Sequence, residues 1–360
     1  EPPSPHTRFA IAIPAHDEAQ VLPATLARLQ EQDYPQALFD VHVVADHCSD
    51  GTAEIVRRNG GIAHERSDLP KGRKAYALQW LLDRLLDGQP AYDAVAVFDA
   101  DSEVDTGFLR IMDAHLAAGS RVLQGQHIVH NPHDSALAAM AAVDMRLNNR
   151  LRNQSRRNLG FSCRLMGDAM VFDAQVLHKV GWVGESLTED REYGYQLLLR
   201  GVRVQYVPQA RSFGQAASRW TQAEPQRLRW YQGVADLQRR LAGPLITGAI
   251  QRRSIATFDG ALELLMPSFS FLWAASALNL LLVLAFQAFE LSPEPVLLLT
   301  GSVLLLVAWT LYPAAGLLAD RAPLWAYRTL LLGPVYLVWR LWISMQVRVR
   351  GDRIAWIRTQ

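Results

Sequence analysis

The sequence predicts an α/β domain with a mostly parallel sheet, followed by amphipathic interface helices and then by transmembrane helices. Two observations support this prediction. Strand-like and helix-like stretches alternate over roughly the first 210 residues, a pattern typical of a parallel sheet with helices on both faces. Two later runs, 264–289 and 295–319, contain no charged residue, and each exceeds the ~20 residues that a helix needs to cross a bilayer. A buried soluble helix is the alternative, made less favourable by the five-residue connection between the runs.

The individual elements follow from the spacing of apolar residues. Short apolar runs predict strands and a 3.6-residue repeat predicts helices. The expected strands are FAIAIP (9–14), VHVVAD (41–46) and AVAVFD (94–99), and the expected helices cover 21–30, 51–60 and 75–86. Sheets of this kind bind ligands beyond the carboxyl ends of their strands, so that edge is where a site is expected.

Composition excludes several classes of protein. The net charge is +1, with 36 Lys and Arg residues against 35 Asp and Glu, and nothing resembles a nucleic-acid footprint. The two cysteines, Cys48 and Cys163, lie far apart, so we expect no disulfide framework and a reducing compartment. The opening residues EPPSPHTRF are polar and proline-rich, unlike a secretory signal.

Acidic residues gather where strands are expected to end. Asp46 and Asp99 each occupy the last position of an apolar run, and Asp101 follows two residues later. Two carboxylates at this spacing can hold one Mg²⁺ or Mn²⁺ that keeps open positions for phosphate. A solvated acidic turn is the alternative, since such a short pattern also occurs in ordinary acidic loops.

Six motifs occur in one order along the chain: VVADHCSDGTAEI, LPKGRKAYAL, VFDADSEVD, NLGFSCRLMG, LTEDREYGYQLLLRG and QRLRW. Together they resemble membrane-bound family 2 glycosyltransferases of the GT-A fold, such as the synthases of exopolysaccharides, cellulose, hyaluronan and poly-N-acetylglucosamine. The resemblance covers roughly residues 8–240. It implies a Rossmann-like GT-A cytosolic domain that moves a sugar, with inversion, from a nucleotide sugar (a UDP-sugar is the expected donor) onto a growing β-linked exopolysaccharide.

The resemblance also implies roles for residues of the donor side. The positions that match nucleotide-binding residues are Pro14, Asp46, Lys74 and Asp99. The matching metal ligands are Asp99 and Asp101, which would hold Mn²⁺ or Mg²⁺. Lys71, Arg73 and Lys74 precede a helix, where they either meet phosphate or cover the surface.

On the acceptor side, the resemblance makes Asp190 of the Thr188-Glu189-Asp190 motif the general base, with Glu189 beside it in the catalytic cluster. A helix N-terminus capped by Thr188 is a compatible reading of the same residues. Asp50, in the turn SDGT, fits a capping role better than Asp46 does.

The Q-x-x-R-W pattern consists of Gln226, Arg229 and Trp230. The resemblance implies that the tryptophan ring stacks on a sugar of the acceptor while Gln and Arg reach the donor diphosphate. A tryptophan among arginines is also typical of an amphipathic helix at a membrane surface.

The predicted organisation is a GT-A domain at 8–215, interface helices at 216–260, two transmembrane helices at 261–319, and an amphipathic interface helix with a possible gating tail at 320–360. Arginines precede the first apolar run and follow the second, whereas the connection FELSPEP has none. The positive-inside rule then places the catalytic domain in the cytoplasm. We expect an integral protein of a bacterial inner membrane.

The C-terminal tail resembles a gating loop in which Trp356 and Thr359 close over the nucleotide; a frayed basic terminus is the alternative. Two other functions stay open at this point: transfer of one sugar to a lipid, and a non-catalytic membrane scaffold. Partner subunits of an exopolysaccharide assembly system are possible. The sequence specifies neither the sugar nor the acceptor.

Overall fold

The computed structural model describes residues 5–67, 74–87, 91–182, 186–289 and 295–350. The chain divides into two compact units. The first, here the sheet unit, comprises Glu1–Asn131, Arg152–Ala216 and Gly233–Leu264. The second, here the helical unit, comprises Pro132–Leu151, Ala217–Gln232 and Leu265–Gln360.

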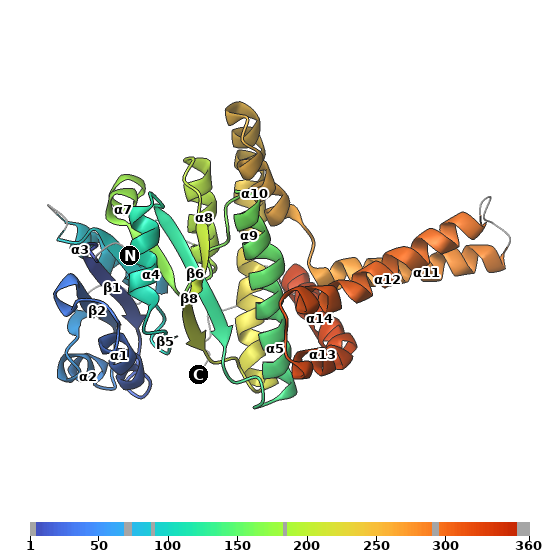
Figure 1. Cartoon of the computed structure of the whole chain (residues 1–360). Helices are drawn as coiled ribbons and strands as arrows, with labels where there is room; N and C mark the ends of the chain where they lie inside the picture. The colour runs from blue at the N-terminus through green and yellow to red at the C-terminus, as the bar shows by residue number, and fades with distance from the viewer. Residues whose placement is uncertain (1–4, 68–73, 88–90, 183–185, 290–294, 351–360) are drawn as a thin grey trace. The chain divides into compact units, whose positions relative to one another are not determined.

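The sheet unit is built on an eight-stranded mixed sheet of order β3-β2-β1-β4-β7-β6-β8-β5 (Figure 1). The β3-β2-β1-β4 part is parallel, as is the β6–β8 pair, whereas β7 runs antiparallel to both of its neighbours and β5 to β8. The predicted mostly parallel sheet is thus confirmed. The strands are β1 (Phe9–Ala15), β2 (Phe39–Asp46), β3 (Ile62–Arg66), β4 (Ala94–Val97), β5 (Glu103–Val104), β6 (Val122–Val129), β7 (Met170–Asp173) and β8 (Gln205–Gly214).

Helices cover both faces of this sheet. The helices expected at 21–30, 51–60 and 75–86 are present as α1, α2 and α3. The sheet unit also holds the C-terminal part of α9, from Gly233 onward. The helices of this unit are α1 (Leu22–Gln30), η1 (Gln36–Leu38), α2 (Thr52–Arg58), α3 (Lys74–Leu86), α4 (Phe108–Ala117), α6 (Ser155–Asn158), α7 (Ala174–Val180), α8 (Glu189–Leu199), α9 (Trp220–Arg252) and α10 (Ile255–Leu265).

Strand β1 shows why the sheet is buried on both faces. Phe9, Ile11 and Ile13 are fully buried in one apolar cluster with residues of α1 and α4, and Ala10 and Ala12 are fully buried in a second with residues of α3 and α8. Successive side chains of a strand point to opposite faces, so an uninterrupted apolar run serves both cores. Full burial of each large side chain stabilises the fold by about 1.5–3 kcal/mol.

The carboxyl ends of the strands differ in one respect from prediction. Asp46 is the last residue of β2, as expected, but β4 ends at Val97, two residues before Asp99. The amide of Asp99 donates to the Asp168 carboxylate over 3.2 Å rather than to a neighbouring strand. Asp99 therefore lies in the loop beyond the strand.

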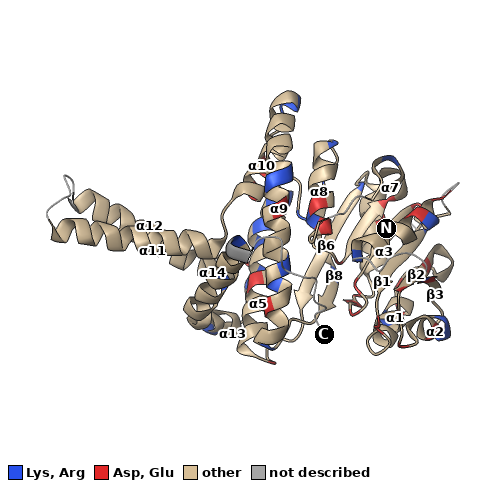
Figure 2. Ribbon diagram, turned by 180° about the vertical axis from the view of Figure 1, so that it is seen from behind, with Lys and Arg blue, Asp and Glu red and all other residues tan. Residues whose placement is uncertain are grey.

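The helical unit contains, apart from the N-terminal part of α9, α5 (Ala136–Leu147), η2 (Asn148–Gln154, shared with the sheet unit), α11 (Phe269–Ala288), α12 (Pro295–Ala319), α13 (Leu324–Thr329), η3 (Leu330–Leu332) and α14 (Gly333–Arg350). Helices α11 and α12 lie side by side (Figure 1). Figure 2 shows neither acidic nor basic residues along them. Trp273 donates to Thr310 over 3.2 Å and Asn279 to Ser302 over 2.8 Å, so two side-chain hydrogen bonds join the helices of this pair.

The described residues include three helical segments long and apolar enough to cross a membrane: Phe269–Ala288, Val296–Ala319 and Leu324–Arg348. The first two lie within the two predicted apolar runs, 264–289 and 295–319. The third combines α13, η3 and α14, where the sequence led us to expect an interface helix. Its position along the membrane surface stays a prediction.

Candidate active site

Lys74, the first residue of α3, lies in the centre of an acidic cluster. Its ammonium group pairs with the Asp99 carboxylate and donates to the Gly167 carbonyl over 3.0 Å. Burial alone would lower the pKa of Lys74, but the charges of Asp99, Glu189 and Asp168 raise it above its ordinary value. Lys74 is therefore a fixed positive charge at the end of the sheet.

Gly167 brings Lys74 and Asp190 close together. Its backbone is left-handed, with φ of +85°, and a Cβ atom there would lie 3.6 Å from Asp190 Oδ2 and 3.9 Å from Lys74 Nζ. A side chain would be strained by this φ and would occupy the space between the two charged groups. The structure thus joins the predicted base to the predicted nucleotide-binding Lys74–Asp99 pair.

Asp190 lies in the first turn of α8. Burial raises its pKa, and the nearby positive charges of Arg191, Lys74 and Arg164 offset this rise only in part. Thr188 occupies the N-cap position, but its hydroxyl makes no capping hydrogen bond. The expected N-cap position of Thr188 is therefore confirmed, although its side chain does not cap the helix. Asp50 accepts from the Thr52 amide over 3.1 Å, as its predicted turn role requires.

The start of α8 is fixed by the part of α9 that belongs to the sheet unit. A Cβ atom at Gly233 would lie 2.7 Å from Thr188 Oγ1, so only glycine allows α9 to approach this closely. Arg240 of α9 donates to Glu192 of α8 over 2.7 Å. These contacts hold Asp190 in place by packing rather than by a helix cap.

Asp168 is a central residue that the sequence analysis missed. Its carboxylate accepts hydrogen bonds from the Asp99 amide and from three side chains: Ser102 at 2.7 Å, His127 at 2.8 Å and Ser212 at 2.5 Å. Burial would raise the pKa of Asp168, but these bonds and the His127 charge lower it to about 2. Asp168 directly follows the NLGFSCRLMG motif and lies two residues before β7. Nothing in the sequence around it indicates its distant hydrogen-bond partners.

Asp101 is the exposed carboxylate of the acidic cluster around Lys74. Desolvation by the surrounding protein and the charges of Asp99 and Asp168 raise the pKa of Asp101. Carboxylates that repel one another are stabilised by a divalent cation, and Mg²⁺ and Mn²⁺ favour oxygen ligands. Because Asp168 is already bonded by four donors, Asp99 and Asp101 are the residues that fit such a cation.

The predicted nucleotide-binding residues of β1 and β2 lie one and two strands away from β4 along the sheet. Asp46 is buried, and its Oδ1 accepts from His47 over 2.9 Å and also pairs with Arg66. Pro14 is half-buried in β1 opposite Val44. Contact of these two residues with a nucleotide stays a prediction.

A second buried charge cluster lies behind Asp190, around Glu263 of α10. Arg164 Nε donates to Glu263 over 2.8 Å, Tyr195 OH donates to it over 3.1 Å, and Arg191 lies 3.6 Å away. Burial would raise the pKa of Glu263, but Arg164 and Arg191 hold it well below its usual range. No sequence motif marks Glu263, whose role follows only from these contacts.

The Q-x-x-R-W residues lie on α9 in the helical unit. Gln226 and Arg229 are half-buried, and Trp230 is 38% exposed. The Arg227 guanidinium lies 4.9 Å from the centre of the Trp230 ring, and Arg227 donates to Tyr336 OH over 2.8 Å. Arg227 therefore restrains the ring that is predicted to stack on a sugar. The predicted residues Lys71, Arg73, Trp356 and Thr359 lie outside the described part of the chain.

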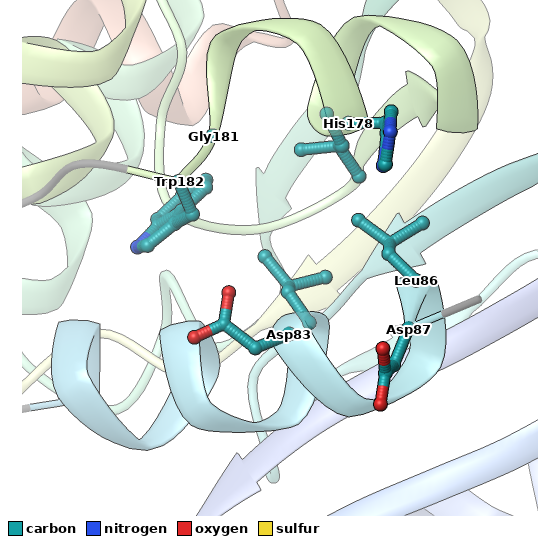
Figure 3. A pocket seen from close by; sticks show the side chains of 8 residues that line it. Asp83, Leu86, Asp87, His178, Gly181 and Trp182 are labelled. Atoms are coloured by element: carbon teal, nitrogen blue, oxygen red, sulfur yellow. The ribbon is translucent and has the colours of Figure 1, made fainter.

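A cavity of about 260 Å³ opens between α3 and α7. Figure 3 shows Asp83 and Leu86 of α3, and Asp87 directly after it, among the residues that line the cavity. Among the described residues, none of the predicted site residues lines it. Asp83 is nine positions beyond Lys74, which corresponds to roughly 13 Å along a helix. This cavity is therefore separate from the acidic cluster.

Comparisons with known proteins show the family and the type of fold. The family described as "Glycosyltransferase like family 2" matches residues 5–233. Glucomannan 4-beta-mannosyltransferase 7 of Arabidopsis thaliana is 23% identical over 247 residues, which are 66% of this chain and 44% of that protein. The UDP-forming cellulose synthase catalytic subunit of Pseudomonas fluorescens (strain SBW25) is 26% identical over 243 residues, 64% of this chain and 31% of that protein.

The chain thus spans less than half the length of these two relatives. Among solved structures, the mannosyltransferase PcManGT from Pyrobaculum calidifontis, in complex with GDP-Man and Mn²⁺, is similar in fold, with a TM-score of 0.53 and 18% identity over 87% of this chain and 89% of that one. The predicted GT-A type of fold is confirmed. The family match covers more than half of the chain and contains all six motifs. The chain therefore belongs to glycosyltransferase family 2.

Proposed function

We propose that this protein transfers a hexose, with inversion, from a nucleotide sugar onto a growing β-linked polysaccharide at a membrane surface. The observation that carries the proposal is the meeting of Asp190 with the Lys74–Asp99 pair around Gly167. An inverting transfer requires a base for the acceptor and a charged group for the departing diphosphate, and this arrangement supplies both within one cluster.

Asp190 is the proposed general base. A sugar hydroxyl is a weak nucleophile, and a carboxylate that accepts its proton during attack contributes about 10²–10⁴-fold to the rate. The raised pKa of Asp190 makes its carboxylate a stronger base than an exposed aspartate. The negative charge of Glu189, after that of Asp99, raises the pKa of Lys74. Glu189 is proposed to act in this indirect way.

Lys74 is proposed to bind the diphosphate of the donor. Its ammonium group is positive at neutral pH and lies next to Asp99. A divalent cation, when held by Asp99 and Asp101, supplies Lewis-acid neutralisation of the charge on the leaving nucleoside diphosphate. The Pyrobaculum relative was solved with Mn²⁺ and GDP-Man, which supports testing Mn²⁺ first.

The acceptor is proposed to be a polysaccharide because two relatives are named as glucomannan mannosyltransferase and cellulose synthase. Gln226, Arg229 and Trp230 are proposed to hold it or the donor diphosphate. The apolar segments are proposed to anchor the chain in the bilayer, with arginines such as Arg253 and Arg321 on the cytoplasmic side. A UDP-sugar is the proposed donor.

Transfer of one sugar to a lipid is the second candidate. Val283 is the only hydrophobic side chain of α11 that is buried within the described residues, and only 6% of the most apolar window of α12 is buried. Two helices with so little packing around them do not enclose a conduit for a polymer. This observation favours an acceptor that is itself in the membrane.

Product analysis separates the two candidates. We would incubate the purified chain in detergent with Mn²⁺ and radiolabelled UDP-glucose, UDP-N-acetylglucosamine or GDP-mannose, then size the products and extract them with organic solvent. A ladder of high mass from one donor supports the polysaccharide reaction. One small, extractable product would replace it with the lipid reaction.

Asp190→Asn tests the assignment of the base. It is expected to lower kcat by about 10²–10⁴-fold while nucleotide affinity, measured by calorimetry, changes little. Asp33→Asn, at an exposed carboxylate paired with Arg110, is the matched control and should keep full turnover. Full turnover by Asp190→Asn would contradict the proposed role.

A further inference from the structure

A cluster of different chemistry lies at the ends of β1 and β2. His16 and Asp17 follow β1, and Cys48 lies two residues beyond the end of β2. Their potential ligand atoms all lie within 4.8 Å of one another, in the part of the chain that the structure describes. The sequence analysis assigned Cys48 no ligand role, so this grouping comes from the fold.

The His16 ring is oriented as a metal ligand would be. Its Nδ1 lies 2.6 Å from the carbonyl oxygen of Asp46. A carbonyl only accepts hydrogen bonds, so Nδ1 carries the proton and neutral His16 has its lone pair on Nε2. Nε2 lies 3.7 Å from Asp17 Oδ2. Metal-binding histidines usually donate their other ring N–H to a carbonyl or carboxylate in this manner.

The Asp17 carboxylate is held in a matching orientation. Its Oδ1 accepts from the Ser49 amide over 2.6 Å and from the Ser49 hydroxyl over 3.2 Å, while Oδ2 faces His16. The backbone of Asp17 is left-handed, with φ of +55°. In this conformation the Asp17 amide donates to Cys48 Sγ over 3.3 Å. This hydrogen bond holds the sulfur next to the His16 and Asp17 side chains.

We propose that His16 Nε2, Asp17 Oδ2 and Cys48 Sγ bind one Zn²⁺ ion, with a water molecule in the fourth position. A nitrogen, oxygen and sulfur donor set suits Zn²⁺ and is unsuited to Mg²⁺ or Mn²⁺, which favour oxygen alone. On coordination, Cys48 binds as the thiolate and its proton passes to solvent, while His16 stays neutral.

The spacing of the His16 and Asp17 ligand atoms agrees with a tetrahedral ion, and the Cys48 sulfur lies within 4.8 Å of both. Zinc bonds of about 2.0–2.3 Å place neighbouring ligand atoms roughly 3.3–3.8 Å apart, and the His16–Asp17 separation of 3.7 Å already falls in this range. The ion would join the loop after β1 to the loop after β2. It is distinct from a cation at Asp99 and Asp101, which follow β4 on the other side of β1.

Metal analysis of the whole chain tests the proposal without any transfer assay. Tag-free protein in detergent is dialysed against Zn²⁺ in the presence of excess Mg²⁺, and bound metal is measured by elemental analysis; Co²⁺ then replaces Zn²⁺ as a spectroscopic probe. One Zn²⁺ per chain and a thiolate-to-cobalt charge-transfer band are expected. Absence of stoichiometric Zn²⁺, or of the band, would overturn the proposal.

Three variants sharpen the test. Cys48→Ser should abolish the cobalt band and weaken Zn²⁺ binding at least about tenfold, whereas Cys163→Ser, at the other cysteine, should change neither. His16→Gln retains a donor for the Asp46 carbonyl and lacks the ring nitrogen, so it should fold and bind Zn²⁺ weakly. Wild-type Zn²⁺ affinity in the folded Cys48→Ser and His16→Gln variants would place the ion elsewhere.

The Asp99→Asn/Asp101→Asn double variant should retain Zn²⁺, since these residues belong to the other proposed cation site. Loss of Zn²⁺ from this double variant alone would assign the ion to the Asp99–Asp101 pair and overturn the proposal. Because none of these measurements requires turnover, their failure is distinguishable from failure of the proposed glycosyl transfer.

Discussion

Asp168 and Asp190 are two carboxylates of the same acidic region, and their environments shift their pKa values in opposite directions. Both lose solvent contact, which raises a carboxyl pKa. At Asp168, hydrogen bonds from His127 and two serines outweigh this effect and lower the pKa. At Asp190, the surrounding charges do not outweigh it, and the pKa is raised.

The opposite pKa shifts indicate a structural role for Asp168 and a chemical role for Asp190. A carboxylate with every acceptor site bonded has no capacity left for a proton from substrate, so Asp168 is suited to hold the loop of Asp99. A carboxylate with a raised pKa is suited to accept a proton, and such groups cluster at functional sites. Asp190 has such a raised pKa although it lies beside Gly167, the residue that directly precedes Asp168.

Asp168→Ala is the change with the largest expected effect on stability. Removal of one partner from a buried, hydrogen-bonded charge pair costs about 3–5 kcal/mol of unfolding free energy, here because His127 and the serines lose their acceptor. Chemical denaturation of the purified chain measures this. Asp33→Ala is the control, and its exposed ion pair should contribute only about 0–1 kcal/mol.

The pH dependence of stability tests whether the ionised form of Asp168 stabilises the fold. The pKa of Asp168 is lowered from 3.8 in the folded state, so its contribution is present above 3.8 and is lost as pH falls through the folded-state value. Melting temperatures of wild type and Asp168→Ala should therefore converge toward pH 2. A difference that stayed constant down to this pH would contradict the low pKa.

Glu263→Gln is expected to have a smaller effect, on the pH profile. Without the negative charge of Glu263, Arg164 and Arg191 act more strongly on Asp190 and lower its pKa. The acid limb of kcat/KM should then move to lower pH by on the order of one unit. Asp259→Asn, which disrupts a 2.7 Å pair with Arg156, is the control that should leave the limb in place.

Asp190→Asn should have the smallest effect on stability, and one of opposite sign to that of Asp168→Ala. Because folding raises the pKa of Asp190, its ionised form disfavours the folded state at neutral pH. A neutral residue of the same shape removes this penalty, so thermal unfolding should occur at the same or a slightly higher temperature. A clear loss of stability would show that Asp190 is a structural carboxylate like Asp168.

Local patterns predicted a large part of the fold. The apolar runs at β1 and β2 and the helical repeats at α1 to α3 are dense enough to specify these elements, because burial on both faces of a sheet requires uninterrupted apolar residues. The end of β4 was misplaced by two residues, since the Asp99 amide bonds a side chain that is 69 positions away in the sequence. A hydrogen-bond partner so distant in the sequence cannot be predicted from the residues around Asp99.

The candidate site was predicted only in part. Motif spacing found Asp99, Asp101 and Asp190, each of which stands in a recognisable acidic pattern. Asp168 and Glu263 have no such pattern, because their roles depend on hydrogen bonds and ion pairs with residues of other elements. The His16, Asp17 and Cys48 grouping was missed for the same reason, since two neighbouring strand ends had to be placed side by side.

The sequence by itself determined the elements, the order of the strand–helix units, the long apolar helices and the family, since each is recorded in residues close together along the chain. Tertiary structure alone decided which carboxylates are bonded and which are only buried. Protonation depends on desolvation and on charges a few ångströms away, and around Asp168 and Asp190 those charges come from helices and strands far apart in the sequence.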